Sequence, residues 1–88
     1  MKDLIANYTV VSGAGSWQEG ACIRWHGYWQ IFKQGSDGQL VFLERDRTPN
    51  EGLSQQDAAA VGRIRGIAYA EELAVRDQAE TCFSLEFA

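Results

Sequence analysis

The stretch Ala21–Lys33, ACIRWHGYWQIFK, alternates between two kinds of residue in the manner of one long β-strand. The apolar side at period two is Ile23, Trp25, Trp29 and Ile31, and the opposite side is Arg24, His26, Tyr28 and Gln30. The first side is typical of a core. Because Arg, Tyr and His are frequent where proteins grip their partners, the second side indicates a binding surface. Reading His26-Gly27 as a tight turn instead would spoil the apolar side, so we favour a single strand, with Gly27 at a bulge or a close backbone approach.

Three further segments have strand character. Asn7–Ser12 is rich in β-formers and is followed by a glycine-rich loop at 13–16. Gln39–Arg45 returns after the turn signal QGSDG at 34–38. Thr81–Phe87 alternates again, with Phe83, Leu85 and Phe87 on its apolar side.

A single helix is predicted from about Gln55 to about Gln78, with Ser54 as its N-cap, Asp57 in its first turn and Leu53 stapled to Ala58. The stripe expected to pack on the sheet is Ala60, Val61, Ile64, Ile67, Ala68, Ala74 and Val75. The opposite side carries Gly62, Gly66, Tyr69 and Leu73. We interpret that side as a docking groove or a homodimer contact, or else as the seat of a loop such as 45–52.

These elements predict one α+β domain over residues 1–88, in the order βββαβ, with a four-stranded antiparallel sheet and one long helix on one face. A lone helix covers only one face of such a sheet. The other face, with Arg24, His26, Tyr28 and Gln30, is expected to be open to solvent or to a partner.

The composition is that of a soluble globular protein, with 45% hydrophobic and 23% charged residues. We recognise neither a secretory signal nor a membrane span, so we expect a cytoplasmic protein with no membrane partner. Its two cysteines, Cys22 and Cys82, are sixty residues apart and are expected to be free thiols.

The net charge of −4 comes from the second half, where residues 44–88 hold five Arg against nine acidic residues. Residues 1–43 hold three basic and three acidic residues. This balance argues against nonspecific nucleic-acid binding and is compatible with a basic protein partner. The residues Arg24, His26 and Tyr28 would also suit a stacking platform for single-stranded nucleic acid, but the acidity favours protein.

No catalytic, metal or cofactor motif is recognisable. Cys22 and His26 lie four residues apart on one strand, about 13 Å, which is too far for proton transfer. Cys82 would have to approach His26 from an adjacent strand to form a thiol site. Two Cys and one His do not make a zinc site, and the glycines at 13 and 15 precede no phosphate-binding helix. Glu71 is expected at the edge of the helix stripe, paired or solvated.

In format the whole chain resembles the small acidic proteins that phages encode against host defence, of which the anti-CRISPR proteins are the best-known group. The shared features are the length of 88 residues, the acidity, the sheet with a helix, and the absence of a catalytic motif. The resemblance implies stoichiometric binding to a nucleic-acid-handling complex in the host cytoplasm, with carboxylates occluding a basic channel. The carboxylates in question are Glu44, Asp46, Glu51, Glu71, Glu72, Asp77 and Glu80.

The leading hypothesis is therefore a non-enzymatic binding protein that inhibits a larger protein complex, without cofactor and without direct nucleic-acid contact. The second is a structural homo-oligomer built through the Gly62, Gly66, Tyr69 and Leu73 side of the helix. The third is a small thiol-dependent enzyme.

Overall fold

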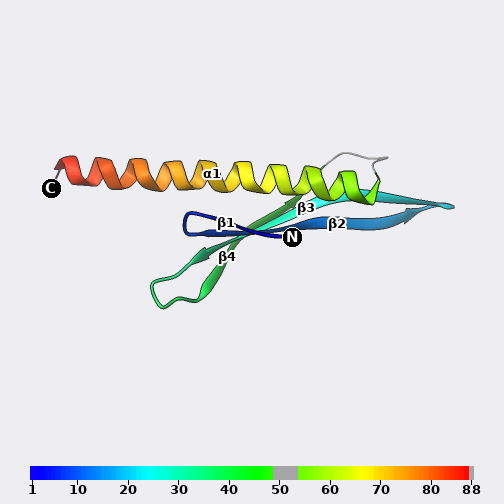
Figure 1. Ribbon diagram of the computed structural model, residues 1–88, viewed down its shortest axis with the longest axis horizontal. Helices are drawn as coiled ribbons and strands as arrows, with labels where there is room; N and C mark the ends of the chain where they lie inside the picture. The colour runs from blue at the N-terminus through cyan, green and yellow to red at the C-terminus, as the bar shows by residue number, and fades with distance from the viewer. Residues whose placement is uncertain (49–53, 88) are drawn as a thin grey trace.

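The computed structural model describes residues 1–48 and 54–87, with helix side chains described as far as residue 79. The elements are β1 Lys2–Ile5, β2 Tyr8–Glu19, β3 Cys22–Gln34, β4 Leu40–Arg47 and α1 Gln55–Phe87. The strands form one antiparallel sheet in the order β1-β2-β3-β4, and α1 lies along one face of it (Figure 1). The predicted α+β class, the four-stranded antiparallel sheet and the long covering helix are confirmed.

The order of elements is ββββα, so the predicted order βββαβ is wrong in its last part. Thr81–Phe87 is not a strand but the end of α1, which spans 33 residues and about 50 Å. No Gly or Pro follows Gln78, and a helix that is already nucleated propagates through residues that do not break it. The fourth strand is instead β1, which pairs with β2 at the edge of the sheet.

The glycine-rich segment predicted as a loop belongs to β2, which continues through Gly13–Ser16 and pairs with β3 over its whole length. The turn lies further on, where Gly20 has a positive φ of 62°. The prediction of one uninterrupted strand across His26-Gly27 is confirmed, and so is the turn between β3 and β4. The β3–β4 ladder is irregular between Ile31 and Phe32.

The helix approaches the sheet most closely where glycines meet. A Cβ built on Gly27 would lie 2.2 Å from the carbonyl oxygen of Ala58 and 2.7 Å from the amide nitrogen of Gly62. A Cβ on Gly66 would lie 2.7 Å from Val10 Cγ1. Side chains larger than hydrogen would push the two layers apart at these points.

The core lies beside these glycines, between α1 and the central strands. Its buried apolar side chains are Tyr8, Val10, Trp29, Ile31 and Ala70, against which Tyr69 and Leu73 pack. Val10 and Ile31 are fully buried. Burial of these side chains stabilises the fold by about 25 cal/mol per Å² of apolar area removed from water.

The predicted orientation of the helix is wrong, because the side that faces the sheet is the one with Gly62, Gly66, Tyr69 and Leu73. Much of the stripe expected to be buried points outward: Ala60 and Ala68 are exposed, Ile64 is 68% exposed and Val75 is 65% exposed. Close contact through glycines and one aromatic ring therefore prevails over burial of the larger aliphatic residues. The sheet itself covers these glycines, in place of the predicted partner or 45–52 loop.

Polar contacts at both ends of α1 fix its position. Ser54 Oγ accepts a hydrogen bond of 3.1 Å from the Asp57 amide, which confirms the predicted N-cap, while Leu53 lies outside the described residues. Arg63 makes a two-pronged ion pair with Asp3 on β1. Tyr8 donates a hydrogen bond to Asp77, and Lys33 Nζ lies 3.4 Å from the same carboxylate.

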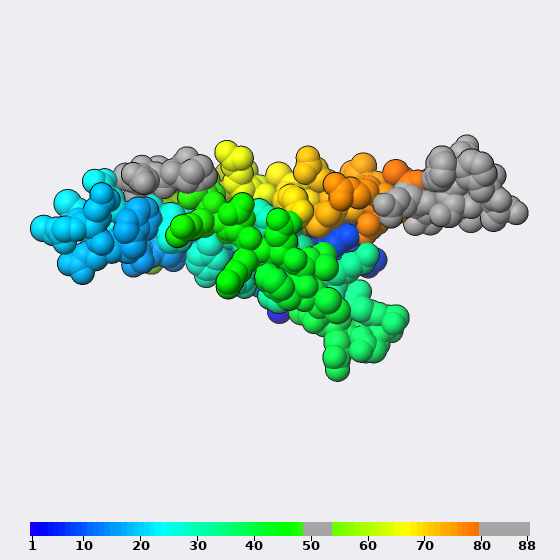
Figure 2. Space-filling model, turned by 180° about the vertical axis from the view of Figure 1, so that it is seen from behind, coloured from blue at the N-terminus to red at the C-terminus, as the bar shows by residue number. Residues whose placement is uncertain are grey.

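The β2–β3 hairpin extends beyond the N-terminal end of α1, and the β3–β4 hairpin projects away from the helix (Figures 1 and 2). Ile23, predicted as core, is consequently 66% exposed near the hairpin tip. All residues of β4 are exposed, because the helix packs on β2 and β3. Within the described residues, no helix has both the length and the apolar character needed to cross a membrane.

Candidate functional site: the open face of the sheet

We call the sheet side turned away from α1 the open face. Directly opposed residues of an antiparallel pair share a face, so the register defines it. Its members are Lys2, Leu4, Thr9, Val11, Gly13, Gly15, Trp17, Glu19, Cys22, Arg24, His26, Tyr28, Gln30, Phe32, Gln34, Leu40, Phe42, Arg45 and Arg47. The four residues predicted for this face from the alternation of β3 do lie on it, and all four are half-buried.

Two aromatic rings of the open face lie down on glycines of β2. A Cβ on Gly13 would be 2.8 Å from the hydroxyl oxygen of Tyr28, and one on Gly15 would be 3.0 Å from Nε2 of His26. The rings therefore lean across the sheet from β3 instead of standing off it. Trp17 extends this row, with its ring centroid 5.3 Å from that of His26. We call Tyr28, His26 and Trp17 the aromatic row. Its first two rings lie directly over glycines of β2.

The row continues toward β4 through polar and basic side chains. Tyr28 is opposed by Arg47 and Gln30 by Arg45. A shallow cleft of about 450 Å³ lies here, lined by His26, Tyr28, Gln30, Arg45 and Arg47, with Trp29 and Asp46 completing it. Arg45 and Arg47 are exposed and form no ion pair with any residue that the structure describes. The cleft thus combines two aromatic rings of the open face, two arginines without an ion pair in the described part of the chain, and one acidic residue, Asp46.

Charge is separated between the two sides of the molecule. The strand residues of the open face include four basic ones, Lys2, Arg24, Arg45 and Arg47, and one acidic one, Glu19. Glu19 lies 3.5 Å from Arg24. The helix side of the strands together with α1 as far as residue 79 carries four basic residues, Lys33, Arg63, Arg65 and Arg76, and seven acidic ones, Asp3, Glu44, Asp46, Asp57, Glu71, Glu72 and Asp77. The open face of this acidic protein is therefore positive.

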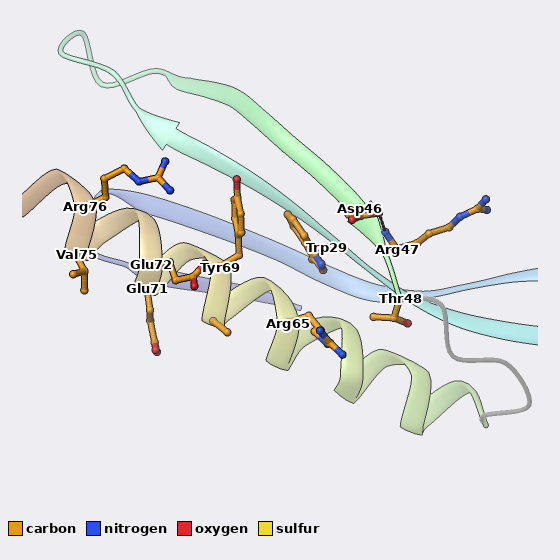
Figure 3. Close-up of a pocket in the computed structure, with 11 residues that line it drawn as sticks. Trp29, Asp46, Arg47, Thr48, Arg65, Tyr69, Glu71, Glu72, Val75 and Arg76 are labelled. Atoms are coloured by element: carbon orange, nitrogen blue, oxygen red, sulfur yellow. Dashed lines mark hydrogen bonds between the residues drawn. The ribbon is translucent and has the colours of Figure 1, made fainter.

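A larger groove of about 870 Å³ lies on the other side, between β4 and α1 (Figure 3). Its wall includes Trp29 and Tyr69, whose rings stack at a centroid distance of 5.1 Å. Tyr69 also donates a hydrogen bond to Glu44, which raises the pKa of the tyrosine hydroxyl above its ordinary value of 10.0. Acidic and basic side chains alternate around this groove: Asp46, Glu71 and Glu72 against Arg47, Arg65 and Arg76. Because these charges balance, the groove offers a ligand neither a positive nor a negative surface. Its two aromatic rings stack on each other where the helix packs on the sheet.

The remaining predicted site residues do not form one surface. Gly62, Gly66, Tyr69 and Leu73 contact the chain's own sheet, so the homo-oligomer contact predicted for them is wrong in its geometry. Glu44 is bound to Tyr69, and Asp77 is bound to Tyr8 and Lys33. Asp46 and Glu72 line the mixed groove. The side chains of Glu51 and Glu80 lie outside the described ones.

Arg45 and Arg47 were not predicted as members of the open face. LVFLERDR alternates acidic and basic residues from Glu44 to Arg47 at a strand's period of two, but this alternation does not by itself say which charges share a face with Tyr28. The turn at 35–39 pairs Phe32 with Phe42, and an unbroken register from there would place Glu44 and Asp46 opposite Gln30 and Tyr28. The irregularity between Ile31 and Phe32 shifts the register by one residue, so that Arg45 and Arg47 take these positions instead.

The arrangement predicted for a thiol site is not formed. Cys22 is an exposed free thiol at the end of β3, on the same strand as His26. Cys82 lies on α1, some twenty residues or about 30 Å along the helix from the Gly27–Gly62 contact, and not on a strand beside His26. Among the described residues, no group of three His, Cys, Asp or Glu side chains is placed to hold a metal ion.

Comparison with protein-family models, with curated proteins and with solved structures finds no match for this chain.

Proposed function

We propose that this protein is a non-enzymatic binding protein that acts on a larger partner through the open face of its sheet. The observation that carries the proposal is the one-sided architecture: α1 covers one face, and the other presents half-buried aromatic residues among four basic side chains and one acidic one. Surfaces of aromatic residues and arginine are those that contribute most to macromolecular contacts. The partner's contacting surface should accordingly be anionic.

The resemblance in format to phage-encoded inhibitors of host defence supports a nucleic-acid-handling complex as this partner, with one-to-one binding and occlusion as the mode of inhibition. Among the carboxylates that the resemblance points to, those with described side chains are divided between contacts with Tyr8, Lys33 and Tyr69 and the groove between β4 and α1. The positive open face therefore supports contact with an anionic element of such a complex more than mimicry of nucleic acid against a basic channel.

The test is affinity capture from host lysate with the parent chain and two open-face variants, Tyr28→Ala and the double substitution Arg45→Glu/Arg47→Glu. We expect a stoichiometric partner that is recovered with the parent and lost with the double variant. The matched control is Arg65→Glu/Arg76→Glu, which changes the net charge equally on the helix and should retain the partner. Recovery of no partner at micromolar concentration, or equal loss with the control, would contradict the proposal.

A further inference from the structure

We infer that the open face binds single-stranded nucleic acid, with bases stacked on Tyr28 and His26 and phosphates held by Arg45 and Arg47. This inference rests on the proposed function and names the chemical class of its partner. The strand register and the cleft on the open face carry it together.

The aromatic row is placed for stacking. Tyr28 and His26 lie two residues apart on one face of β3, about 7 Å along the strand. Their rings rest on Gly13 and Gly15, and glycine leaves them room to lie along the sheet, so that bases can stack on them. Antiparallel four-stranded sheets with exposed aromatic residues are a recurrent platform for two or three stacked bases. Gln30, next in the row, adds an amide that can pair with a base edge.

The basic residues are placed for the sugar–phosphate backbone. Arg45 and Arg47 lie on β4, directly beside Gln30 and Tyr28, so the cations form one wall of the cleft and the rings form its floor. Neither arginine forms an ion pair with a described residue, and the cleft that they line contains one acidic residue, Asp46. Guanidinium groups that lack a protein carboxylate are available for bidentate contact with phosphate, which releases the condensed counterions.

Net acidity does not oppose this binding, because the acidic residues lie mainly on the other side of the sheet. They belong to α1, to the helix-facing side of β4 and to Asp3, which is paired with Arg63. At physiological ionic strength the screening length is about 8 Å, comparable with the thickness of one layer of secondary structure. A ligand on the open face therefore interacts chiefly with the local positive charge. The sequence-based expectation of a protein partner combined the net charge with the frequency of such residues at protein interfaces, and it did not consider where the charges lie.

The shape of the surface selects single strands. A duplex is read by an element that enters a groove, a helix or a two-stranded β-ribbon in the major groove of about 12 Å width. Here α1 lies on the far side of the sheet from the cleft, and the aromatic side chains lie on the face of the sheet. A cleft of about 450 Å³ on this face accommodates small planar groups such as unstacked bases, which single strands present.

The experiment is fluorescence anisotropy with labelled single-stranded RNA and DNA oligonucleotides of mixed sequence, and with the matching duplex, over a range of salt concentrations. We expect a single strand to bind more tightly than the duplex. Arg45→Glu/Arg47→Glu should weaken binding at least tenfold. It should also lower the slope of log K against log salt by about 1.4, since each phosphate that an arginine neutralises adds about 0.7 to that slope. Tyr28→Ala should weaken binding about tenfold, within the range known for base stacking, and leave the salt slope unchanged.

The matched control is again Arg65→Glu/Arg76→Glu, which alters the net charge by the same amount and should change affinity less than about threefold, because both residues lie on the helix side. Circular dichroism and urea unfolding of every variant establish that the fold is retained. The inference is overturned if neither oligonucleotide binds at low salt, or if the helix control weakens binding as much as the open-face variant. Absence of oligonucleotide binding together with capture of a partner that requires Arg45 and Arg47 also overturns it, but leaves the proposed function standing and identifies an acidic protein surface as the ligand.

Discussion

The two faces of the sheet are built from alternate residues of the same strands, yet they are packed by different rules. On the helix side, Gly27 and Gly62 bring two backbones together and leave no room for even one added carbon atom. On the open face, Gly13 and Gly15 are covered only by the ends of movable side chains, Tyr28 and His26. Glycine therefore allows close packing on one side of the sheet and shapes the surface on the other. The first of the following comparisons tests this difference, and the other three test the packing and the polar contacts of the helix side.

The largest difference is expected between Gly27→Ala and Gly13→Ala. The new methyl group at position 27 would meet backbone atoms of α1 at 2.2 Å and 2.7 Å, so the helix must move. We expect a loss of about 3 kcal/mol in the free energy of unfolding, at the upper end for overpacked sites. At position 13 the methyl group meets the hydroxyl end of Tyr28, which can rotate away, and the loss should stay below about 1 kcal/mol. Urea unfolding measures both, and equal losses would contradict the described helix contact.

A second comparison tests the orientation of α1. Ile31 is fully buried, and Ile31→Ala should cost about 3 kcal/mol through lost burial and a residual cavity. Ile64, predicted as core from the helical period, is 68% exposed, and Ile64→Ala should lie within about 0.5 kcal/mol of the parent. If Ile64→Ala proved as costly as Ile31→Ala in urea unfolding, the helix would have to face the sheet with its aliphatic stripe.

A third comparison concerns acid. The hydrogen bond from Tyr8 and the charge of Lys33 hold the pKa of Asp77 below its ordinary value of 3.8, and Arg63 does the same for Asp3. The pKa values of these carboxylates are lower in the folded state than in the unfolded state. The carboxylates therefore stabilise the protein at pH values above their unfolded-state pKa, and this stabilisation is lost as the pH falls through their folded-state pKa. We expect the urea midpoint to fall as the pH drops below about 4, and to fall less in Asp77→Asn. Glu72→Gln, on the exposed side of α1, is the control and should behave like the parent.

The smallest effect is expected at alkaline pH, from Tyr69. Its hydrogen bond to Glu44 raises the pKa of the hydroxyl above 10.0, so its contribution to stability is present below that value and is lost as pH rises through the folded pKa. In an ultraviolet absorbance titration, Tyr69→Phe should remove a tyrosine that ionises above pH 10.0. Loss of a tyrosine that ionises at or below pH 10.0 would contradict the hydrogen bond to Glu44.

The alternation of β3 was sufficient to predict which of its residues lie on the open face, because a period of two is set by the backbone alone. The covering helix was predicted separately, from its N-cap at Ser54 and its helical period. The orientation of α1 was not predictable in the same way. A hydrophobicity pattern ranks Ile64 and Val75 above Gly62 and Gly66, whereas the packing depends on how near two backbones come, which involves Gly27 from another element. The end of α1 was missed because seven alternating residues suit a strand, and only the uninterrupted helix before them decides otherwise.

About half of the candidate site could be predicted from the sequence. Arg24, His26, Tyr28 and Gln30 follow from the period of β3, whereas Arg45 and Arg47 join them only through the pairing of β4 with β3. The net charge is a sum over the sequence and contains no information about which residues share a face. The separation of charge between the two sides of the sheet depends on the strand register, including its shift between Ile31 and Phe32.

The opposite charges of the two sides give the molecule an electric dipole directed from α1 toward the open face. In the field of a distant polyanion such a dipole experiences a torque, so the protein turns its arginines forward before any contact is made. The same dipole governs how the protein attaches to charged solids. On a positively charged bead it should settle on its helix side and keep Tyr28 turned to the liquid, which makes this the natural orientation for immobilised binding measurements.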